Sequence, residues 1–345
     1  MTRIAVDALN LRADERGMGR YVRPVLQTLT SHAGIELTLL VHDHRDAAVL
    51  RAIAGDQAKV AALRTARLRD RYDAVWYPWN GVRFAAHAPA LVTINDDFAF
   101  TFPASGVVAR WREQRPILRA VRCATRFATI SSWSRDRLAA RFGIDATRIG
   151  IIPLRPNPFF SPGRQTSPFA EPFVLAVGGS EPRKNIPFLV DVFCSAFPNG
   201  DVRLVIVGSV DTATQRVIAT SVVPIDVLGN CDNDELRSLY RTASAVAVPS
   251  LAEGFGLVTV EAQACGAAVI AANASALPEA VGEAGLLVDL GDRGGWIAAL
   301  RNVVRDNAVR SPLCARGIAR WAQPPRENAA SAVLALLHGL VDDRA

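Results

Sequence analysis

Two glutamates flank a glycine-rich loop in the second half of the chain. Glu253 and Glu261 lie eight positions apart, and Gly254 and Gly256 between them permit a sharp turn and a close approach of the backbone to a ligand. The surrounding pattern predicts a strand, this loop and then a helix over about 257–265. Free amides at the start of such a helix form a site for an anion. Carboxylates beside it fit a phosphate flanked by hydroxyl-rich groups, which is the shape of a nucleotide sugar.

The sequence Glu253-Gly-Phe-Gly256, followed by Glu261, resembles the signature of the retaining glycosyltransferases of family 4. In that family the first glutamate binds hydroxyls of the transferred sugar and the second binds the ribose. The resemblance implies these roles for Glu253 and Glu261, with Phe255, Gly256 and Leu257 lining the diphosphate. The alternative interpretation is an ordinary strand–loop–helix turn with solvated glutamates.

A second segment carries two adjacent cations. In Gly178-Gly-Ser-Glu-Pro-Arg-Lys-Asn185, Arg183 and Lys184 precede a predicted helix, where cations and free amides could neutralise a diphosphate. The segment resembles the family's Gly-Gly-x-x-Glu-Pro-Arg-Lys-Asn. Many relatives carry a further arginine soon after the glycines, where this chain has Gly179 and Ser180. Arg183 and Lys184 are therefore the predicted catalytic pair.

Glycines also lie between the first predicted strand and the first helix. Gly17-Met-Gly-Arg20 would let the backbone approach a phosphate, as in doubly wound sheets. It resembles the family's Gly-Ile-Gly-Arg-Tyr, which lies over the donor diphosphate or the acceptor, so Gly17, Gly19 and Arg20 are predicted binding residues. By the same resemblance, Gly229 frames the nucleobase through backbone contacts.

Asn95 departs from the family pattern, which usually has His-Asp where this chain has Asn95-Asp96. Asparagine can hydrogen-bond a sugar hydroxyl, but it is no acid or base near neutral pH. We predict a catalytic position for Asn95 nonetheless. The alternative is that Asn95 and Asp96 cap the next turn. The family is thought to use same-face attack, with the departing phosphate accepting the acceptor's proton, and Asn95 agrees with that scheme.

The length of 345 residues predicts two domains, because a single core normally stops growing below that size. Strand and helix patterns alternate in both halves, separated by a proline-rich segment over 154–172 that predicts a linker and hinge. The fold class is α/β. The resemblance implies two doubly wound, Rossmann-like domains facing a central cleft, the GT-B architecture. We place an acceptor-binding domain at 1–160 and a nucleotide-sugar-binding domain at 161–327, with a final helix over about 328–345 packing back on the first.

Charge is distributed unevenly along the chain. Residues 1–165 contain 25 Lys and Arg against 14 Asp and Glu, whereas residues 166–345 contain 14 against 19. A predicted helix over 107–127 carries an arginine stripe at positions 112, 115, 119, 122 and 126. Such a stripe is either a solvated face or a contact for an acceptor phosphate or a membrane surface. We therefore expect a saccharide or lipid-linked acceptor and a peripheral membrane contact through the basic domain, and no nucleic-acid partner.

Metal and targeting signals are weak. The cysteines lack metal spacing and suggest buried free thiols of a reducing cytoplasm, and Asp232-Asn-Asp234 is interpreted as a helix cap rather than a metal motif. No apolar run reaches the ~18 residues of a membrane span, and no signal peptide is evident. We expect no metal and no cofactor, and a cytoplasmic protein at or near the inner face of the membrane.

The sequence therefore predicts a retaining glycosyltransferase that moves a sugar from a nucleotide diphosphate sugar to a hydroxyl in bacterial surface-polysaccharide or glycoconjugate synthesis. GDP-mannose is the first choice of donor, because the combined motifs most resemble bacterial mannosyltransferases; UDP-glucose, UDP-N-acetylglucosamine and dTDP-rhamnose stay open. Two alternatives are a sugar-nucleotide hydrolase or epimerase of the same fold, and a non-catalytic nucleotide-sugar-binding subunit.

Overall fold

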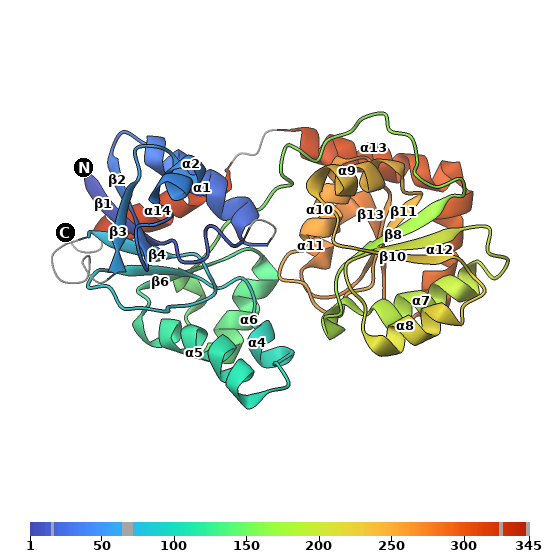
Figure 1. Cartoon of the computed structure of the whole chain (residues 1–345), viewed down its shortest axis with the longest axis horizontal. Coiled ribbons are helices and arrows are strands. Elements are labelled where there is room, and N and C mark those ends of the chain that lie inside the picture. Colours follow the sequence, from blue (N-terminus) through green and yellow to red (C-terminus); the bar gives the residue numbers. More distant parts are fainter. Residues whose placement is uncertain (15–16, 64–71, 324–326, 343–345) are drawn as a thin grey trace. The chain divides into compact units, whose positions relative to one another are not determined.

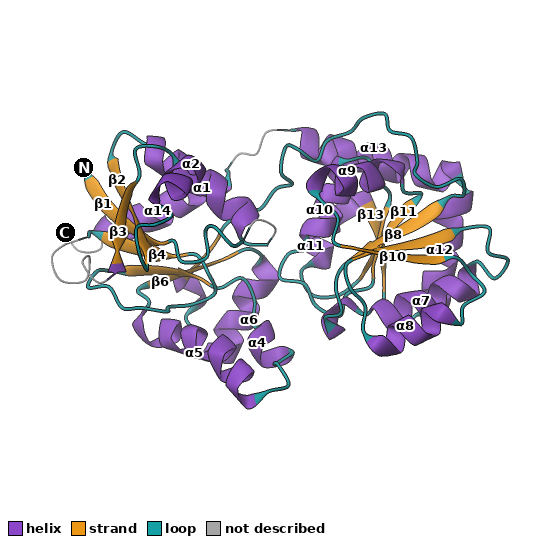
Figure 2. Cartoon of the chain, viewed as in Figure 1, coloured by secondary structure: helices purple, strands orange, loops and turns teal. Residues whose placement is uncertain are grey.

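The computed structural model describes residues 1–14, 17–63, 72–323 and 327–342. The chain divides into two compact units (Figure 1). Unit 1 comprises Met1–Leu154 and Pro325–Ala345, and unit 2 comprises Arg155–Pro324. Strands and helices alternate through both units (Figure 2). Each unit is therefore an α/β layer structure of its own.

Unit 1 is built on a seven-stranded parallel sheet in the order β3-β2-β1-β4-β5-β6-β7. Its strands are β1 (Thr2–Asp7), β2 (Ile35–Val41), β3 (Lys59–Ala62), β4 (Ala74–Tyr77), β5 (Ala90–Thr93), β6 (Arg126–Thr129) and β7 (Ile149–Ile151). Its described helices are α1 (Gly19–Ser31), α2 (Ala47–Ala54), α4 (Phe98–Thr101), α5 (Val107–Cys123), α6 (Ser132–Phe142) and α14 (Ala329–Asp342), with a 3-10 turn η1 (Ala146–Arg148). Figure 1 shows α1, α2 and α14 on one face of the sheet and α5 and α6 on the other.

Unit 2 is built on a six-stranded parallel sheet in the order β10-β9-β8-β11-β12-β13. Its strands are β8 (Phe173–Val177), β9 (Arg203–Val207), β10 (Ile225–Gly229), β11 (Ala245–Val248), β12 (Val269–Ala272) and β13 (Gly285–Val288). Its helices are α7 (Ile186–Ala196), α8 (Thr212–Ala219), α9 (Asn233–Thr242), α10 (Leu257–Ala264), α11 (Leu277–Val281), α12 (Arg293–Arg305) and α13 (Asn307–Ala322), with 3-10 turns η2 (Pro182–Lys184) and η3 (Gly282–Ala284).

Both sheets reverse their winding at one place. In unit 1 the chain runs from β1 out to β2 and β3, then returns to β4 on the other side of β1. In unit 2 it runs from β8 out to β9 and β10, then returns to β11 on the other side of β8. Ligands of open α/β sheets bind outside the carboxyl ends of the strands at such a switch point. The topology therefore directs attention to the ends of β1 and β4, and of β8 and β11.

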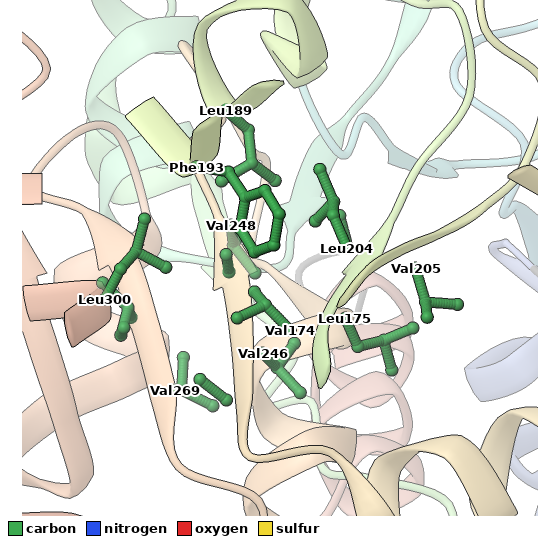
Figure 3. Close-up of a cluster of buried hydrophobic side chains, with 14 of the residues drawn as sticks. Val174, Leu175, Leu189, Phe193, Leu204, Val205, Val246, Val248, Val269 and Leu300 are labelled. Atoms are coloured by element: carbon green, nitrogen blue, oxygen red, sulfur yellow. The ribbon is translucent and has the colours of Figure 1, made fainter. Parts of the chain in front are cut away.

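The core of unit 2 explains why its strands are continuous apolar runs. A parallel sheet is covered on both faces, so its strands need apolar side chains at nearly every position. Val174, Leu204 and Val246 lie on adjacent strands and are fully buried, and Leu189 and Phe193 from α7 are buried in the same cluster (Figure 3). Each such side chain contributes about 1.5–3 kcal/mol by leaving water.

One local prediction needs correction. The predicted helix over 107–127 ends at Cys123, and Arg126 belongs to β6, so the arginine stripe is shorter than expected. The two units meet at Leu154 and Arg155, within the predicted linker. The later part of this proline-rich segment packs on unit 2, because Phe160 is buried in its core and Arg241 donates from Nε to the carbonyl of Ser161 (2.9 Å).

The final helix α14 lies on unit 1, where it contacts α1, β4, β5 and β7. Val333, Leu337 and Leu340 are buried along one side of it. The last described segment of the chain therefore completes the core of the first unit, although unit 2 intervenes in the sequence.

We predict that Leu337→Ala loosens unit 1 alone. Leu337 is fully buried, and removing its side chain should lower the stability of unit 1 by about 2–5 kcal/mol. Hydrogen exchange followed by mass spectrometry should show faster exchange in β5 and β7 and no change in β9 and β12. Leu300→Ala, an equally buried site in α12 of unit 2, is the matched control with the reverse pattern. Exchange that rises equally in both units would contradict the assignment.

Candidate functional site

Three predicted residues meet at the switch point of unit 2. Arg183 and Lys184 lie in η2, after β8, and Glu253 lies in the loop after β11. Nζ of Lys184 donates to Oε1 of Glu253 (2.8 Å), and Nη1 of Arg183 donates to Oε2 (2.9 Å). Oγ of Ser250 donates to Oε1 as well (2.8 Å). A carboxylate from one side of the switch point is thus held by two cations from the other side.

Backbone and side-chain hydrogen bonds fasten the two loops together. The amide of Leu251 donates to the carbonyl of Arg183 (2.7 Å), and the amide of Glu253 donates to Oγ of Ser275 (2.9 Å). Asn185 occupies the N-cap position of α7, but its side chain donates to the carbonyl of Pro249 (3.2 Å). The residue therefore bridges the loops after β8 and β11 instead of satisfying the helix amides.

The charge of Glu253 is fixed by its neighbours. Only 8% of the residue is exposed, and burial alone would raise its pKa. Lys184 and Arg183 more than offset this effect and leave the pKa of Glu253 lower than usual. Glu253 is therefore a carboxylate at neutral pH, suited to accept hydrogen bonds from hydroxyl groups.

The two cations are engaged differently. Arg183 contacts a second carboxylate, because its Nε and Nη2 approach Oε2 of Glu181 (2.8 and 2.7 Å), and its Nη1 also reaches the carbonyl of Ala252 (3.3 Å). Lys184 pairs with Glu253, its only ion pair within the described part of the chain. Arg183 is thus held by several acceptors, while the ammonium of Lys184 has donors to spare.

The glycine loop adopts the predicted turn at the start of α10. Gly256 is the N-cap residue with a φ of 105°, a conformation that other residues rarely adopt, and a Cβ there would lie 2.9 Å from Cδ2 of Leu277. Phe255 is buried and Leu257 begins the helix. The three residues predicted to line a diphosphate therefore form one tight strand-to-helix connection beside Glu253.

Glu261 lies deeper than its predicted role suggests. It is 1% exposed, and Oη of Tyr240 in α9 donates to its Oε2 (3.4 Å). The ring of Phe160 packs edge-on against Tyr240, with 5.7 Å between centroids. Sequence patterns gave no signal for Tyr240 or Phe160, because both reach Glu261 only through long-range packing.

Gly229 lies beside the turn that follows β9. It ends β10 with a φ of 65°, and its carbonyl accepts from the amide of Gly208 (2.6 Å).

A cavity of about 200 Å³ lies at the carboxyl ends of β8 and β9. It is lined by Gly179, Ser180, Glu181, Pro182, Asn185, Ile186, Pro187, Val210, Asp211 and Thr214. The cavity adjoins the loop that carries Arg183 and Lys184.

The predicted residues of unit 1 form a separate polar cluster. Asn95 is 4% exposed; its Oδ1 accepts from Oη of Tyr21 (3.3 Å), and its amide donates to Oδ1 of Asn80 (2.8 Å). Gly17 donates from its amide to Oδ1 of Asp14 (2.8 Å), and a Cβ on Gly19 would lie 1.8 Å from the carbonyl oxygen of Asp14. The glycines thus close a tight turn ahead of α1, which carries Arg20 and Tyr21.

The residues after Asn95 have structural partners. Oδ1 of Asp96 accepts from the amide of Phe98 (3.0 Å), which is the turn-capping alternative considered for this position. Asp97 is buried, and its Oδ2 accepts from Nη2 of Arg137 (2.7 Å) and Nε of Arg141 (2.5 Å). The carboxylates at 96 and 97 therefore hold the start of α4. Asn95 instead accepts from Tyr21 of α1.

A buried carboxylate that the sequence did not single out ends β1. Asp7 is fully buried; its Oδ1 accepts from the amide of Leu9 (3.0 Å), and its carbonyl accepts from Nε1 of Trp79 (2.7 Å). Burial raises the pKa of Asp7 to about 6, although the bond from Leu9 and the charges of Arg83 and His42 oppose the rise. A rule that looks for polar residues at the ends of parallel strands would have found Asp7.

Comparison with known proteins assigns unit 2 to a family. Residues 171–306 match the glycosyl transferases group 1 family. The second unit is a group 1 glycosyl transferase domain. The chain is 28% identical to the O-antigen chain mannosyltransferase B of Escherichia coli over 76% of this chain and 73% of that protein. It is 33% identical to the D-inositol 3-phosphate glycosyltransferase of Rhodococcus opacus over 52% of this chain and 45% of that protein. The match of unit 2 to the group 1 family supports a transferase activity.

Solved structures show the fold that carries the group 1 domain. Sucrose-phosphate synthase from Thermosynechococcus elongatus has a TM-score of 0.73 at 19% identity and covers 100% of both chains. The Anabaena protein HepE with UDP-glucose has a TM-score of 0.71 at 16% identity, over 99% of this chain and 100% of that chain. The predicted fold class is confirmed: two parallel-sheet α/β units of the GT-B fold.

Neither a metal-binding cluster nor a membrane-spanning helix is found among the described residues. Within the described ranges, no group of three or more His, Cys, Asp or Glu side chains could hold a metal ion. No helix among those residues is long and apolar enough to cross a membrane.

We predict that Asp7→Asn stabilises the protein at neutral and alkaline pH. The folded state holds the Asp7 proton more tightly than the unfolded state, so the free energy of unfolding falls as pH rises from about 4 to about 6. Asparagine does not titrate, and the variant should gain up to about 3 kcal/mol over the wild type above that window. Thermal unfolding at acid and alkaline pH measures the difference. A variant less stable than the wild type at pH 8 would contradict the prediction.

Proposed function

We propose that this chain is a retaining hexosyltransferase that moves a sugar from a nucleotide diphosphate sugar to a hydroxyl of a saccharide or lipid-linked acceptor. The observation that carries the proposal is the convergence of Lys184 and Arg183 on Glu253 at the switch point of unit 2. The O-antigen mannosyltransferase relative favours GDP-mannose and a role in surface-polysaccharide or glycoconjugate synthesis. HepE was solved with UDP-glucose, so uridine diphosphate sugars are also tested as donors.

In the proposed reaction, the cations of unit 2 stabilise the diphosphate leaving group. Breaking the bond to the diphosphate leaves negative charge on it, and preorganised donors aimed at such charge are the strongest catalytic device available. Lys184, which has spare donors and one carboxylate partner, is the residue we assign to the diphosphate. Arg183 holds Glu253 and Glu181, so its contribution is to keep Glu253 in place as much as to bind phosphate.

Retention follows from same-face attack in this proposal. Asn95 supplies no base, so the departing phosphate takes the proton of the acceptor hydroxyl. Glu253 stays ionised and accepts from hydroxyls of the transferred sugar. A double displacement through a carboxylate nucleophile is the competing route to retention, and it would require Glu253 to leave both of its cations.

Two other functions fit the same fold. An epimerase or hydrolase of sugar nucleotides needs acid and base side chains beside the donor, and residues 155–324 contain no histidine. A non-catalytic subunit would bind the donor without turning it over. The cation network of Lys184, Arg183 and Glu253 favours the transferase, because binding alone does not require a carboxylate that touches the sugar.

We predict that Lys184→Ala and Glu261→Ala each lower donor turnover by about 10²-fold or more, the range of a lost transition-state contact. The chain has two lysines, which gives a matched control. Lys59→Ala removes an exposed lysine paired with Glu36 in unit 1 and should leave turnover unchanged. The measurement is release of GDP from GDP-mannose, or of UDP from UDP-glucose, with and without EDTA.

The same assays decide between the candidate functions. EDTA should not change the rate, because Lys184 and Arg183 supply the positive charge in the proposed reaction. An α-linked product from an α-linked donor, identified by NMR, supports retention. Full activity of Lys184→Ala would show that Lys184 does not stabilise the diphosphate. A free, epimerised nucleotide sugar as the product would show an epimerase instead of a transferase.

Helix α5 offers a membrane contact for a lipid-linked acceptor. Val107, Val108 and Trp111 are 80%, 64% and 55% exposed, which is unusual for apolar side chains at the start of a helix. Its exposed arginines are Arg110, Arg112, Arg115 and Arg122, and the guanidinium of Arg115 lies over the Trp111 ring at 4.7 Å. Apolar side chains beside arginines bind the interface of anionic membranes. We propose this helix as the peripheral contact.

We expect the protein to sediment with vesicles that contain phosphatidylglycerol and not with phosphatidylcholine vesicles. A triple change of Val107, Val108 and Trp111 to serine should abolish sedimentation and leave turnover of a water-soluble acceptor intact. Val217→Ser and Val222→Ser, at exposed apolar sites in unit 2, serve as the control. If the triple variant binds vesicles as well as the wild type does, α5 is not the membrane contact.

A further inference from the structure

One oxygen of a buried carboxylate in unit 1 has no partner among the residues that the structure describes. Oδ1 of Asp7 accepts from Leu9, but Oδ2 is buried and accepts no hydrogen bond from any described residue. Buried polar atoms in native proteins are nearly always bonded, and a charged oxygen left bare costs free energy. An oxygen in this state calls for a ligand, an ion or a water as its missing donor.

The charged side chains that the structure describes near Asp7 do not supply that donor. Nη1 of Arg83 donates to the carbonyl of Trp79 (2.9 Å), and Arg83 and His42 act on Asp7 through their charge without a hydrogen bond. Their positive potential disfavours a bound cation. A neutral hydroxyl suits the position best, because it can donate to a carboxylate without adding charge.

Asp7 occupies the position in unit 1 that the Glu253 network occupies in unit 2. It is the last residue of β1, and β1 and β4 flank the switch point of their sheet, as β8 and β11 do in unit 2. Register places Val6 opposite Trp76, so Asp7 lies beside the end of β4. Asn80, whose side chain binds the amide of Asn95, directly follows Trp79, whose indole binds the carbonyl of Asp7. Asp7 therefore adjoins the polar cluster of Tyr21, Asn80 and Asn95.

We infer that Asp7 is a binding residue for the acceptor, and that its Oδ2 receives a hydrogen bond from a hydroxyl of a sugar or cyclitol seated at the carboxyl edge of the unit 1 sheet. The inference rests on the proposed function, which places the acceptor on unit 1. Residues 8–14, which follow Asp7, form turns without helix or strand.

Neutral polyols provide a test that does not need the donor. We would measure thermal unfolding of the wild type with methyl α-D-mannopyranoside, methyl α-D-glucopyranoside and myo-inositol. A ligand that binds only the folded state raises the melting temperature. The shift should grow as pH rises through about 6, because the ionised Asp7 is the stronger acceptor. Asp7→Asn should weaken polyol binding by about 10-fold or more and abolish its pH dependence.

Asp73→Asn is the matched control. Asp73 precedes β4 and accepts from the amide of Arg3, at the opposite edge of the same two strands, so it reports non-specific effects of polyols on unit 1. The inference is overturned if no polyol shifts the wild type more than it shifts Asp7→Asn, which would leave a buried water as the donor to Oδ2. It is also overturned if Asp73→Asn loses the shift equally.

Kinetics separate this inference from the proposed function. With GDP-mannose as donor and the polyol that gives the largest shift as acceptor, Asp7→Asn should raise KM for the acceptor about 10-fold and leave KM for the donor unchanged. A polyol shift that depends on Asp7, in a protein that turns over no sugar nucleotide, would sink the proposed function and keep the polyol site. Transfer with equal acceptor KM in both proteins would keep the function and sink the role of Asp7.

Discussion

The ion network between Glu253 and the cations of η2 is the constraint on which unit 2 depends. A carboxylate that is 8% exposed loses most of its hydration, and removing either cation would leave that charge poorly compensated. The same contact joins the loops after β8 and β11, which are also tied by Leu251 and Asn185. The chemistry proposed for Lys184 therefore draws on a preformed positive site, and a diphosphate would compete with Glu253 for the ammonium.

The two units have the same strand order around the switch point, but the carboxylates there have opposite pKa shifts. At the switch point of unit 2 a carboxylate meets two cations, and its pKa falls. At the switch point of unit 1, burial outweighs one amide hydrogen bond and the charges of Arg83 and His42, and raises the pKa of Asp7 to about 6. The first arrangement suits the anionic leaving group of the proposed reaction. The second leaves a buried acceptor atom, Oδ2 of Asp7, without a donor among the described residues, which suits a partner that donates hydroxyls.

Local patterns predicted the elements that carry the site, and long-range packing decided the rest. The glycine turn before α10, the position of Lys184 ahead of α7 and the capping box of Asp232 and Glu235 follow from neighbours in sequence. Local patterns do not predict β3, α8, β13 or α13, which are short, half-buried or weakly periodic. The bond from Tyr240 to Glu261 and the burial of Phe160 depend on contacts between distant segments, which no local pattern encodes.

Helix α10 shows why burial of Glu261 is compatible with a role in binding. The helix is held at both ends: Gly256 and Thr259 close its start, and Gln263 accepts from Nε1 of Trp321 (2.9 Å) while donating to the carbonyl of Val281 (3.0 Å). Arg155, the first residue of unit 2, donates to the carbonyls of Trp321 and Gln323. A glutamate on a helix fixed in this way cannot swing out to a ligand. In the proposed reaction, a ribose would therefore reach Glu261 only if Tyr240 or the segment that carries Phe160 moved.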